Sequence, residues 1–285
     1  MKNMKKLLAL ALALLMLLSL SACGGFEMRM ARAASRMSKL ESVHTDAVVT
    51  ADVNLSLMGS SSAMEAKMEL SADTQKEPLL AAGQLNAGVY GISKELGFYA
   101  ERSGDSEISV YLSTDGGQNW ETNTLDMENA SFELDLSAQL KAMAGMAALF
   151  TETGKETVNG VAAVGYAGEI PAETVKQAIE QADVKEKLEE TFDVELADDC
   201  FADVGPIPVT IALAEKSNDI LRVTMDLSQV VSEVLGQVLN QVLNSGDLSL
   251  LGGLGLEVSV DNVQLTVAFS QFDAVTVSIP ENVKG

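Results

Sequence analysis

Histidine and cysteine are nearly absent: the 285 residues include one His and two Cys. Two cysteines cannot supply a disulfide framework or a four-cysteine zinc site, and one histidine excludes paired-histidine metal motifs and most catalytic triads. No metal or other cofactor is therefore expected, and an enzyme is a less favoured interpretation than a binding protein.

Positive charge is also scarce, because 19 Lys and Arg face 41 Asp and Glu, for a net charge of −22. Nucleic acid is excluded as a default partner, since clustered cations supply phosphate binding. The chain is 47% hydrophobic and has only five prolines. That composition indicates a folded protein and not a disordered acidic tail.

The N-terminus has the pattern of an export signal. Lys2, Lys5 and Lys6 precede an apolar run over 7–20, which is shorter than the roughly 20 residues of a membrane span. The run ends at Leu20, Ser21, Ala22 and Cys23, which resemble the lipobox of bacterial lipoproteins. The resemblance implies a signal peptide over 1–22, a diacylglyceryl group on Cys23, a tether over 23–25 and an extracytoplasmic location. The alternative is an ordinary secretory signal that leaves Cys23 as a free thiol.

An amphipathic stretch follows over 26–42. Hydrophobic residues recur there at spacings of three and four, which predicts a helix. Arg29, Arg32, Arg36 and Lys39 share another stripe of this helix and are candidates to face anionic lipid headgroups, each contributing roughly 1 kcal/mol. A solvated helix face is the alternative.

Most of the remaining chain alternates between apolar and polar residues, as in half-buried antiparallel strands. Strands are expected over 43–57, 64–70, 84–92, 97–102, 107–113, 118–122, 156–168, 207–215, 219–226, 257–269 and 272–279. Helical spacing interrupts this pattern over 136–150, 175–188 and 230–243. The expected fold class is α+β, with residues 23–285 in a single domain.

Several segments resemble the LolA/LppX/LprG-like superfamily of bacterial lipoproteins: the lipobox with its following helix, the hairpin-like Glu156–Tyr166, the strand–helix joint Thr224–Ser228, and the closing Ser270–Glu281. The resemblance implies a curved antiparallel sheet forming a half-barrel, helices over its concave face, and acyl chains between them. The protein would bind a lipid or other amphiphile without catalysis. Candidate cavity residues are Met64, Met68, Met143, Phe150, Val234, Leu235, Leu250, Leu251 and Leu254.

Two alternatives remain open. The glycine-rich apolar segment 246–256 is either a lid for an apolar ligand or a connection that packs its leucines on the sheet. The same sheet could also have a filled core and serve as a cell-envelope interaction module with an unknown protein partner.

Three further patterns have simpler explanations. Ser113–Trp120 matches one copy of the Asp-box of sialidases and other propellers, but a propeller needs several blades, so a tight hairpin with Trp120 packed on its neighbour is expected. Glu195, Asp198, Asp199 and Asp203 fit no EF-hand and indicate a solvated loop. Cys200 and His44 are expected to be a buried thiol and a surface side chain, not a nucleophile and its base. An enzyme such as a glycosidase, which uses a pair of carboxylates, is the third interpretation, because none of the acidic pairs in this sequence lies in a recognisable catalytic motif.

Overall fold

A computed structural model describes residues 25–58, 60–104, 107–126, 145–192, 195–244 and 257–284. The lipobox with Cys23, together with Met143, Leu250, Leu251, Leu254 and the segment 246–256, lies outside these residues.

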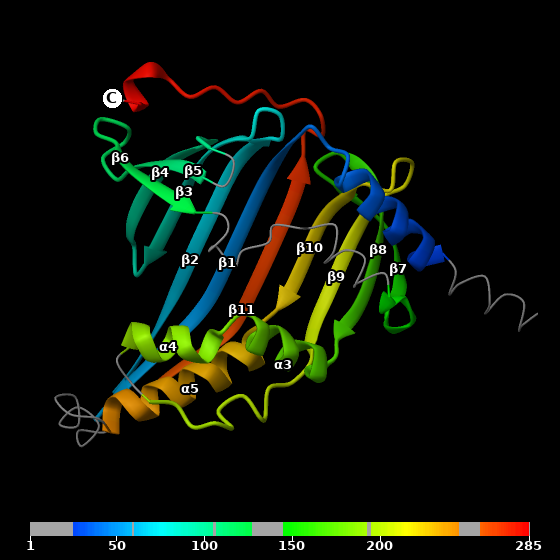
Figure 1. The fold of residues 1–285 in the computed structure, drawn as a ribbon. Coiled ribbons are helices and arrows are strands. Elements are labelled where there is room, and N and C mark those ends of the chain that lie inside the picture. Colours follow the sequence, from blue (N-terminus) through cyan, green and yellow to red (C-terminus); the bar gives the residue numbers. More distant parts are fainter. Residues whose placement is uncertain are drawn as a thin grey trace, which may run out of the picture. The chain divides into compact units, whose positions relative to one another are not determined.

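The described strands form one antiparallel sheet in the order β6-β5-β4-β3-β2-β1-β11-β10-β9-β8-β7 (Figure 1). The end strands β6 and β7 do not pair with each other, so the sheet is open. The strands are β1 Ser42–Leu57, β2 Ser60–Gln75, β3 Leu80–Val89, β4 Ile92–Arg102, β5 Glu107–Ser113, β6 Glu121–Asp126, β7 Thr151–Val158, β8 Val161–Ile170, β9 Ile207–Ala214, β10 Ile220–Asp226 and β11 Glu257–Ser270. The helices are 25–37, α3 Ala172–Gln181, α4 Val184–Phe192 and α5 Ser228–Asn244, with short 3-10 turns η1 Ala147–Leu149 and η3 Glu281–Val283. The predicted α+β class with a curved, open antiparallel sheet is confirmed.

The chain forms two compact units. The first contains residues 1–39, 134–168 and 211–221, and the second contains residues 40–133, 169–210 and 222–285. A single half-barrel domain over 23–285 stays a prediction.

The first unit has a densely packed core. On the N-terminal helix, Met30 and Ala33 are fully buried, as the helical spacing predicted, although the helix ends at 37 and not at 42. The ring of Phe26 stacks on Phe150 with centroids 4.7 Å apart and lies 4.6 Å from the ring of Tyr166. Further buried side chains come from β8, β9 and β10: Ala163, Val164, Ile211, Leu213, Ile220 and Leu221.

The hairpin β7–β8 shows how local sequence sets the register in this unit. Asn159 and Gly160 connect the strands, both with positive φ (49° and 81°), as a two-residue type I′ turn requires. Asn and Gly tolerate the left-handed region at least cost. The hairpin-like segment is therefore confirmed as a hairpin, whereas the single strand expected over 156–168 is wrong, because the turn divides it between β7 and β8.

The second unit contains the helices α3, α4 and α5, which Figure 1 shows grouped at one end of its strands. α5 packs against β11 and contacts α4. At its start, the carboxylate of Asp226 accepts hydrogen bonds from the backbone N–H and the hydroxyl of Ser228, which lower the pKa of Asp226. The predicted strand-to-helix joint is thus closed by a polar residue that binds free helix N-terminal donors.

The prediction of a strand over 272–279 is wrong. This segment is extended but forms no ladder, because its N–H groups donate to side chains: Val275 to the hydroxyl of Ser42 at 3.0 Å and Val277 to the amide oxygen of Gln75 at 3.2 Å. The C-terminal segment therefore crosses the ends of β1 and β2 as a strap.

Candidate functional site

One face of the sheet in the second unit is apolar. Since side chains alternate across a strand, the register places Val49 beside Met68 and Met68 beside Ala87. The same face continues through Leu85 and Leu96. Neighbouring positions carry polar side chains such as Glu65, Lys67 and Glu69, which project from the opposite face.

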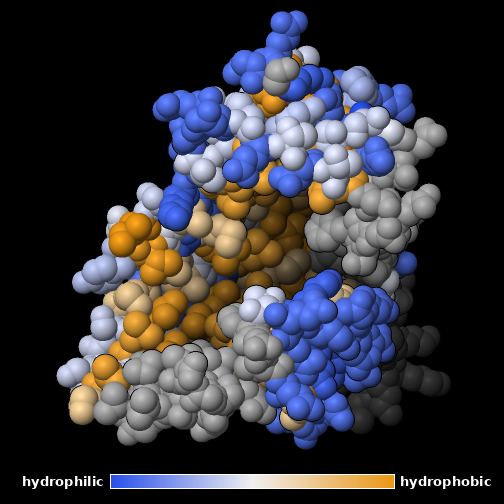
Figure 2. All heavy atoms as spheres, turned by 60° about the vertical axis from the view of Figure 1, so that its left-hand side comes forward, coloured by the Kyte–Doolittle hydropathy of each residue, from blue (hydrophilic) through white to orange (hydrophobic). Residues whose placement is uncertain are grey.

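This apolar face is not fully covered. Met68 is 45% exposed, and Val89 and Ile92 are 47% and 72% exposed. Figure 2 shows hydrophobic residues on the floor of a hollow. Contiguous exposed apolar surface of this kind is characteristic of a ligand-binding groove or an interaction surface.

A groove of about 560 Å³ lies on this face, which we call the apolar groove. Its volume falls within the range of about 300–1,000 Å³ that is typical of small-molecule sites. It is lined by Val49, Ala51, Ala66, Lys67, Met68, Ala87, Gly88, Val89, Tyr90, Ile92 and Lys94.

The rim of the apolar groove is the hairpin between β3 and β4. Val89 pairs with Ile92, and the two residues between them have positive φ, 54° at Tyr90 and 76° at Gly91. This turn holds Tyr90 and Ile92 out into solvent beside the groove, where both are more than 70% exposed. A large apolar side chain held in water in this way loses its favourable burial energy unless something binds there.

Lys67 and Lys94 both border the apolar groove, but only the side chain of Lys94 projects from the apolar face of the sheet, since Lys67 points to the opposite face. Lys67 forms an ion pair with Glu69 at 2.8 Å. Lys94 extends from β4 between Ile92 and Leu96, and among the described residues no acidic group pairs with it. A lysine stem lies readily along apolar surface while its ammonium group stays in water. Lys94 therefore provides a positive charge at the edge of an apolar surface.

The candidates named from the sequence lie in different places. Met68 lines the apolar groove, and Met64 shares its face of β2 in a half-buried position opposite Val53. Val234 and Leu235 are half-buried on α5 and are not part of the groove lining. Phe150 belongs to the core of the first unit. Sequence reasoning missed the rim residues Tyr90, Ile92 and Lys94, because alternation marks a face but not the turn that exposes it.

The basic residues of the N-terminal helix and of the turn after it differ in their contacts. Arg29 donates to Asn218 Oδ1 at 2.8 Å, to the Ala214 carbonyl at 2.9 Å and to the Tyr166 hydroxyl at 3.3 Å, and its guanidinium lies 5.9 Å from the centre of the Tyr166 ring. Arg36 lies 3.4 Å from a carboxylate oxygen of Asp219 and is exposed, as are Arg32 and Lys39. A membrane-facing role for this helix stays a prediction.

The Asp-box segment connects β5 and β6, but residues 113–120 form a longer loop than the predicted tight hairpin, because the last strand pair is Leu112 and Glu121. Asp115 accepts hydrogen bonds from the backbone of Asn119 and Gln118 and from the side chains of Asn119 and Ser113, which lower its pKa to about 2. The indole N–H of Trp120 donates to the Gly117 carbonyl at 3.1 Å, and its ring lies 5.1 Å from that of Tyr99. The predicted packing of Trp120 on a neighbouring strand is confirmed.

Cys200 and His44 lie in different surroundings and do not form a catalytic pair. Cys200 is buried with Leu196 and Val238, and burial raises the pKa of its thiol, which disfavours the nucleophilic thiolate. His44 lies 2.6 Å from Asp73 and 3.2 Å from Asp46. Burial lowers the pKa of His44, but these carboxylates outweigh it and raise the pKa above 6.5.

The acidic loop around Cys200 contains no cluster of metal ligands among the described residues. Asp198 is paired with Lys185 at 2.8 Å, which lowers the pKa of Asp198 and raises that of Lys185. None of the helices in the described part of the chain has the length and apolar character needed to cross a membrane.

No family model matches the chain, and no curated protein matches it significantly in sequence. Similar solved structures include the lipoprotein LppX of Mycobacterium tuberculosis, with 14% identity, TM-score 0.43, and alignment over 89% of this chain and 98% of LppX. LprF of Mycobacterium bovis has 13% identity, TM-score 0.47, and alignment over 91% and 98%. A Vibrio parahaemolyticus domain ascribed to outer membrane lipoprotein sorting has 9% identity, TM-score 0.18, and alignment over 83% and 88%. At these identities and TM-scores the similarities carry no ligand, partner or role to this chain.

Proposed function

We propose that this protein is an extracytoplasmic lipoprotein, anchored through a lipid on Cys23, that binds an amphiphile without catalysis. The observation that carries the proposal is the apolar groove of about 560 Å³, whose lining residues Met68, Val89 and Ile92 are 45%, 47% and 72% exposed. Folding alone does not bury this surface, so a bound acyl chain would gain roughly 0.8 kcal/mol for each methylene group that it removes from water.

The groove also favours one orientation of the ligand. Its floor is made of Val49, Ala51, Ala66 and Ala87, which offer no polar side-chain group, whereas Lys94 stands at the edge. An amphiphile would therefore place its acyl chain on the floor and an anionic headgroup beside the Lys94 ammonium. A surface ion pair of this type contributes about 0–1 kcal/mol, so the acyl chain supplies most of the affinity.

The proposed lipid anchor would bring the apolar groove close to a supply of amphiphiles. The two acyl chains of a diacylglyceryl group would anchor the protein stably, and the exposed cations Arg32 and Lys39, which follow Cys23 closely in sequence, would add attraction to anionic lipids. A protein held at a membrane in this way meets its amphiphile at high local concentration.

Paired valine substitutions test the groove. Val89 lines the groove and is 47% exposed, whereas Val161 lies in the first unit and is 44% exposed. Val89→Ser should weaken binding of a fluorescent fatty acid several-fold, and Val161→Ser should leave it unchanged, although both remove the same side chain at equal exposure. Equal affinities of the two variants, or no fatty-acid binding by the parent protein, would overturn the proposal.

The alternative is an interaction module whose apolar face docks a protein. The exposed Tyr90 and Ile92 at the hairpin tip favour this alternative, because aromatic and aliphatic side chains anchor many interfaces. Tyr90→Ser would then abolish binding of a protein partner. Competition between fatty acid and that partner would place both on the apolar groove.

A further inference from the structure

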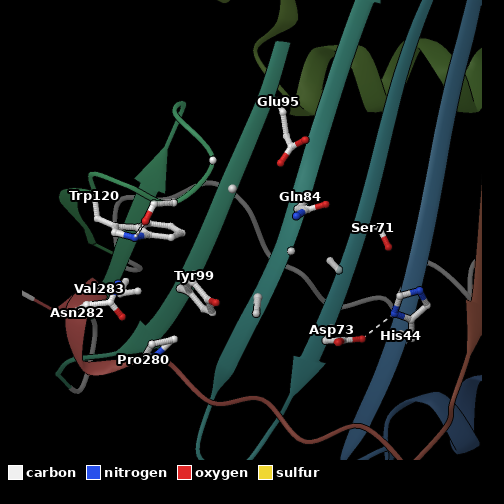
Figure 3. A pocket seen from close by; sticks show the side chains of 16 residues that line it. His44, Ser71, Asp73, Gln84, Glu95, Tyr99, Trp120, Pro280, Asn282 and Val283 are labelled. Carbon is white, nitrogen blue, oxygen red and sulfur yellow. Dashed lines mark hydrogen bonds and ion pairs between the residues drawn. The ribbon is translucent and has the colours of Figure 1, made fainter. Parts of the chain in front are cut away.

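The polar face of the same sheet carries a second hollow, which we call the polar trough. It encloses about 520 Å³ and runs across β1, β2, β3 and β4, with His44, Asp73, Gln84 and Tyr99 on successive strands (Figure 3). All of its lining residues belong to the second unit. It is lined by His44, Ser71, Ala72, Asp73, Ala82, Gly83, Gln84, Glu95, Gly97, Tyr99, Gly116, Gly117, Trp120, Pro280, Asn282 and Val283.

One end of the polar trough is an aromatic pair. The rings of Trp120 and Tyr99 lie 5.1 Å apart at an angle of 53°. Trp120 is fixed by its hydrogen bond to the Gly117 carbonyl, within the turn that Asp115 organises. Gly97 lies beneath the indole, because a methyl group at this position would reach within 3.5 Å of the ring. The aromatic surface is therefore fixed before any ligand arrives.

The C-terminal strap forms a wall of the trough. Pro280, Asn282 and Val283 line the hollow, and Val283 is buried. The strap is held by Val277, whose N–H donates to Gln75, and by Lys284, which pairs with Glu101 at 2.6 Å. The trough is thus preformed, so a ligand would spend little binding energy on ordering it.

The polar trough offers both hydrogen-bond donors and hydrogen-bond acceptors. Among the described residues, the side chains of Ser71, Gln84, Glu95, Tyr99 and Asn282 make no hydrogen bond to protein. Hydroxyls and amides both donate and accept, whereas a carboxylate only accepts. The set therefore matches a ligand with many hydroxyl groups better than an ammonium ion, which would leave the amide N–H donors without acceptors.

The charge of the trough limits which class of ligand it can bind. The imidazole of His44 lies between Asp73 and Asp46. When protonated it offsets only one of these two carboxylates, and Glu95 adds a further negative charge to the trough. The protein as a whole carries a net charge of −22. An anionic ligand is disfavoured on both counts.

We infer that the polar trough binds a neutral oligosaccharide. The apolar C–H face of one sugar ring packs against Trp120 and Tyr99, and hydroxyl groups of the following rings bond Gln84, Glu95 and Asn282. This site lies on the opposite face of the sheet from the apolar groove and does not depend on amphiphile binding.

Tryptophan fluorescence tests the inference directly, because Trp120 is the only tryptophan of the chain. The full chain in a detergent without a sugar headgroup is titrated with cellohexaose, maltohexaose and N-acetylated chitohexaose. At least one of these should give a saturable change in emission. Gln84→Ala and Glu95→Ala should each weaken that binding tenfold or more. The control Gln118→Ala alters an exposed side chain of the same turn that does not line the trough, and it should leave the affinity unchanged.

Two outcomes would overturn the inference. The first is no saturable change in emission with any of the three oligosaccharides at millimolar concentration. The second is binding of spermidine, without any oligosaccharide binding, that Glu95→Ala abolishes, which would identify a cation site. The groove variant Val89→Ser separates this test from that of the proposed function. It should lose fatty-acid affinity and keep oligosaccharide affinity, so either site can fail without the other.

Discussion

The two units of this protein use hydrophobic residues differently. In the first unit, Met30, Leu213 and Ile220 are buried almost completely. In the second, Met68 occupies an equally regular apolar pattern on β2 yet remains 45% exposed beside the apolar groove. A core that folding buries supplies stability, whereas an apolar face left half exposed retains binding energy that a ligand can still use. The contrast between these units is the main physical argument for a ligand site in the second unit.

The largest expected effect contrasts two methionines. Met30→Ala should lower the free energy of unfolding by about 2–5 kcal/mol, because a fully buried side chain leaves a cavity. Met68→Ala should cost about 1 kcal/mol or less, since half of that side chain already contacts water. Urea unfolding followed by circular dichroism measures both, and similar costs would contradict the contrast.

The next effect concerns ligand-induced protection. A fatty acid at about 100 times its dissociation constant adds roughly 2.7 kcal/mol to the free energy of opening the structure that binds it. Hydrogen exchange should therefore slow in β2, β3 and β4, which line the groove, and stay unchanged in the β7–β8 hairpin of the first unit. Equal slowing in both places would show that the ligand does not select the groove.

A smaller effect distinguishes the two kinds of arginine on the N-terminal helix. Arg29→Met removes three hydrogen bonds within the first unit and should destabilise the protein by about 1–3 kcal/mol. Arg32→Met should change stability by less than about 0.5 kcal/mol, because Arg32 is exposed. Thermal unfolding compares the two variants. A larger loss at Arg32 would mean that the exposed side of the helix, and not its buried side, holds the unit together.

The smallest expected effect is the pH dependence contributed by His44. Its pKa is raised above 6.5 in the folded protein by Asp73 and Asp46, against the effect of burial. The folded state therefore binds this proton more tightly than the unfolded state does, so the stabilisation is complete below pH 6.5 and disappears as pH rises through the folded pKa. The difference in free energy of unfolding between the parent protein and His44→Gln should therefore fall as pH rises from 6.5 through the folded pKa, as measured by urea titrations at a series of pH values. A difference that grows with pH would contradict the assigned partners.

Local sequence predicted much of this fold because the relevant signals are local. Asn159–Gly160 specifies a tight hairpin, and the alternation at Met64, Ala66 and Met68 specifies a strand with one apolar face. Alternation failed at 272–279, because a strand also needs a neighbour to pair with, and Val275 and Val277 find side chains of Ser42 and Gln75 instead.

The sites were harder to predict than the strands. Periodicity placed both Met30 and Met68 in regular apolar patterns. Only the tertiary structure shows that Met30 is buried and that Met68 is partly exposed. The polar trough joins Trp120, His44 and the C-terminal Asn282, which are far apart in sequence. No local pattern indicates that such residues meet, although the packing of Trp120 on a neighbour was predictable from its turn.

Native mass spectrometry with lipid extraction most directly tests the claim that the apolar groove binds an amphiphile. The protein would be expressed in bacteria with Cys23→Ser, so that no lipid is attached covalently, and purified without detergent. We expect a lipid bound at about one copy per chain, and less of it with Val89→Ser than with Val161→Ser. A mass without ligand, together with no uptake of added fatty acids or phospholipids, would contradict it and favour the docking of a protein on the apolar face.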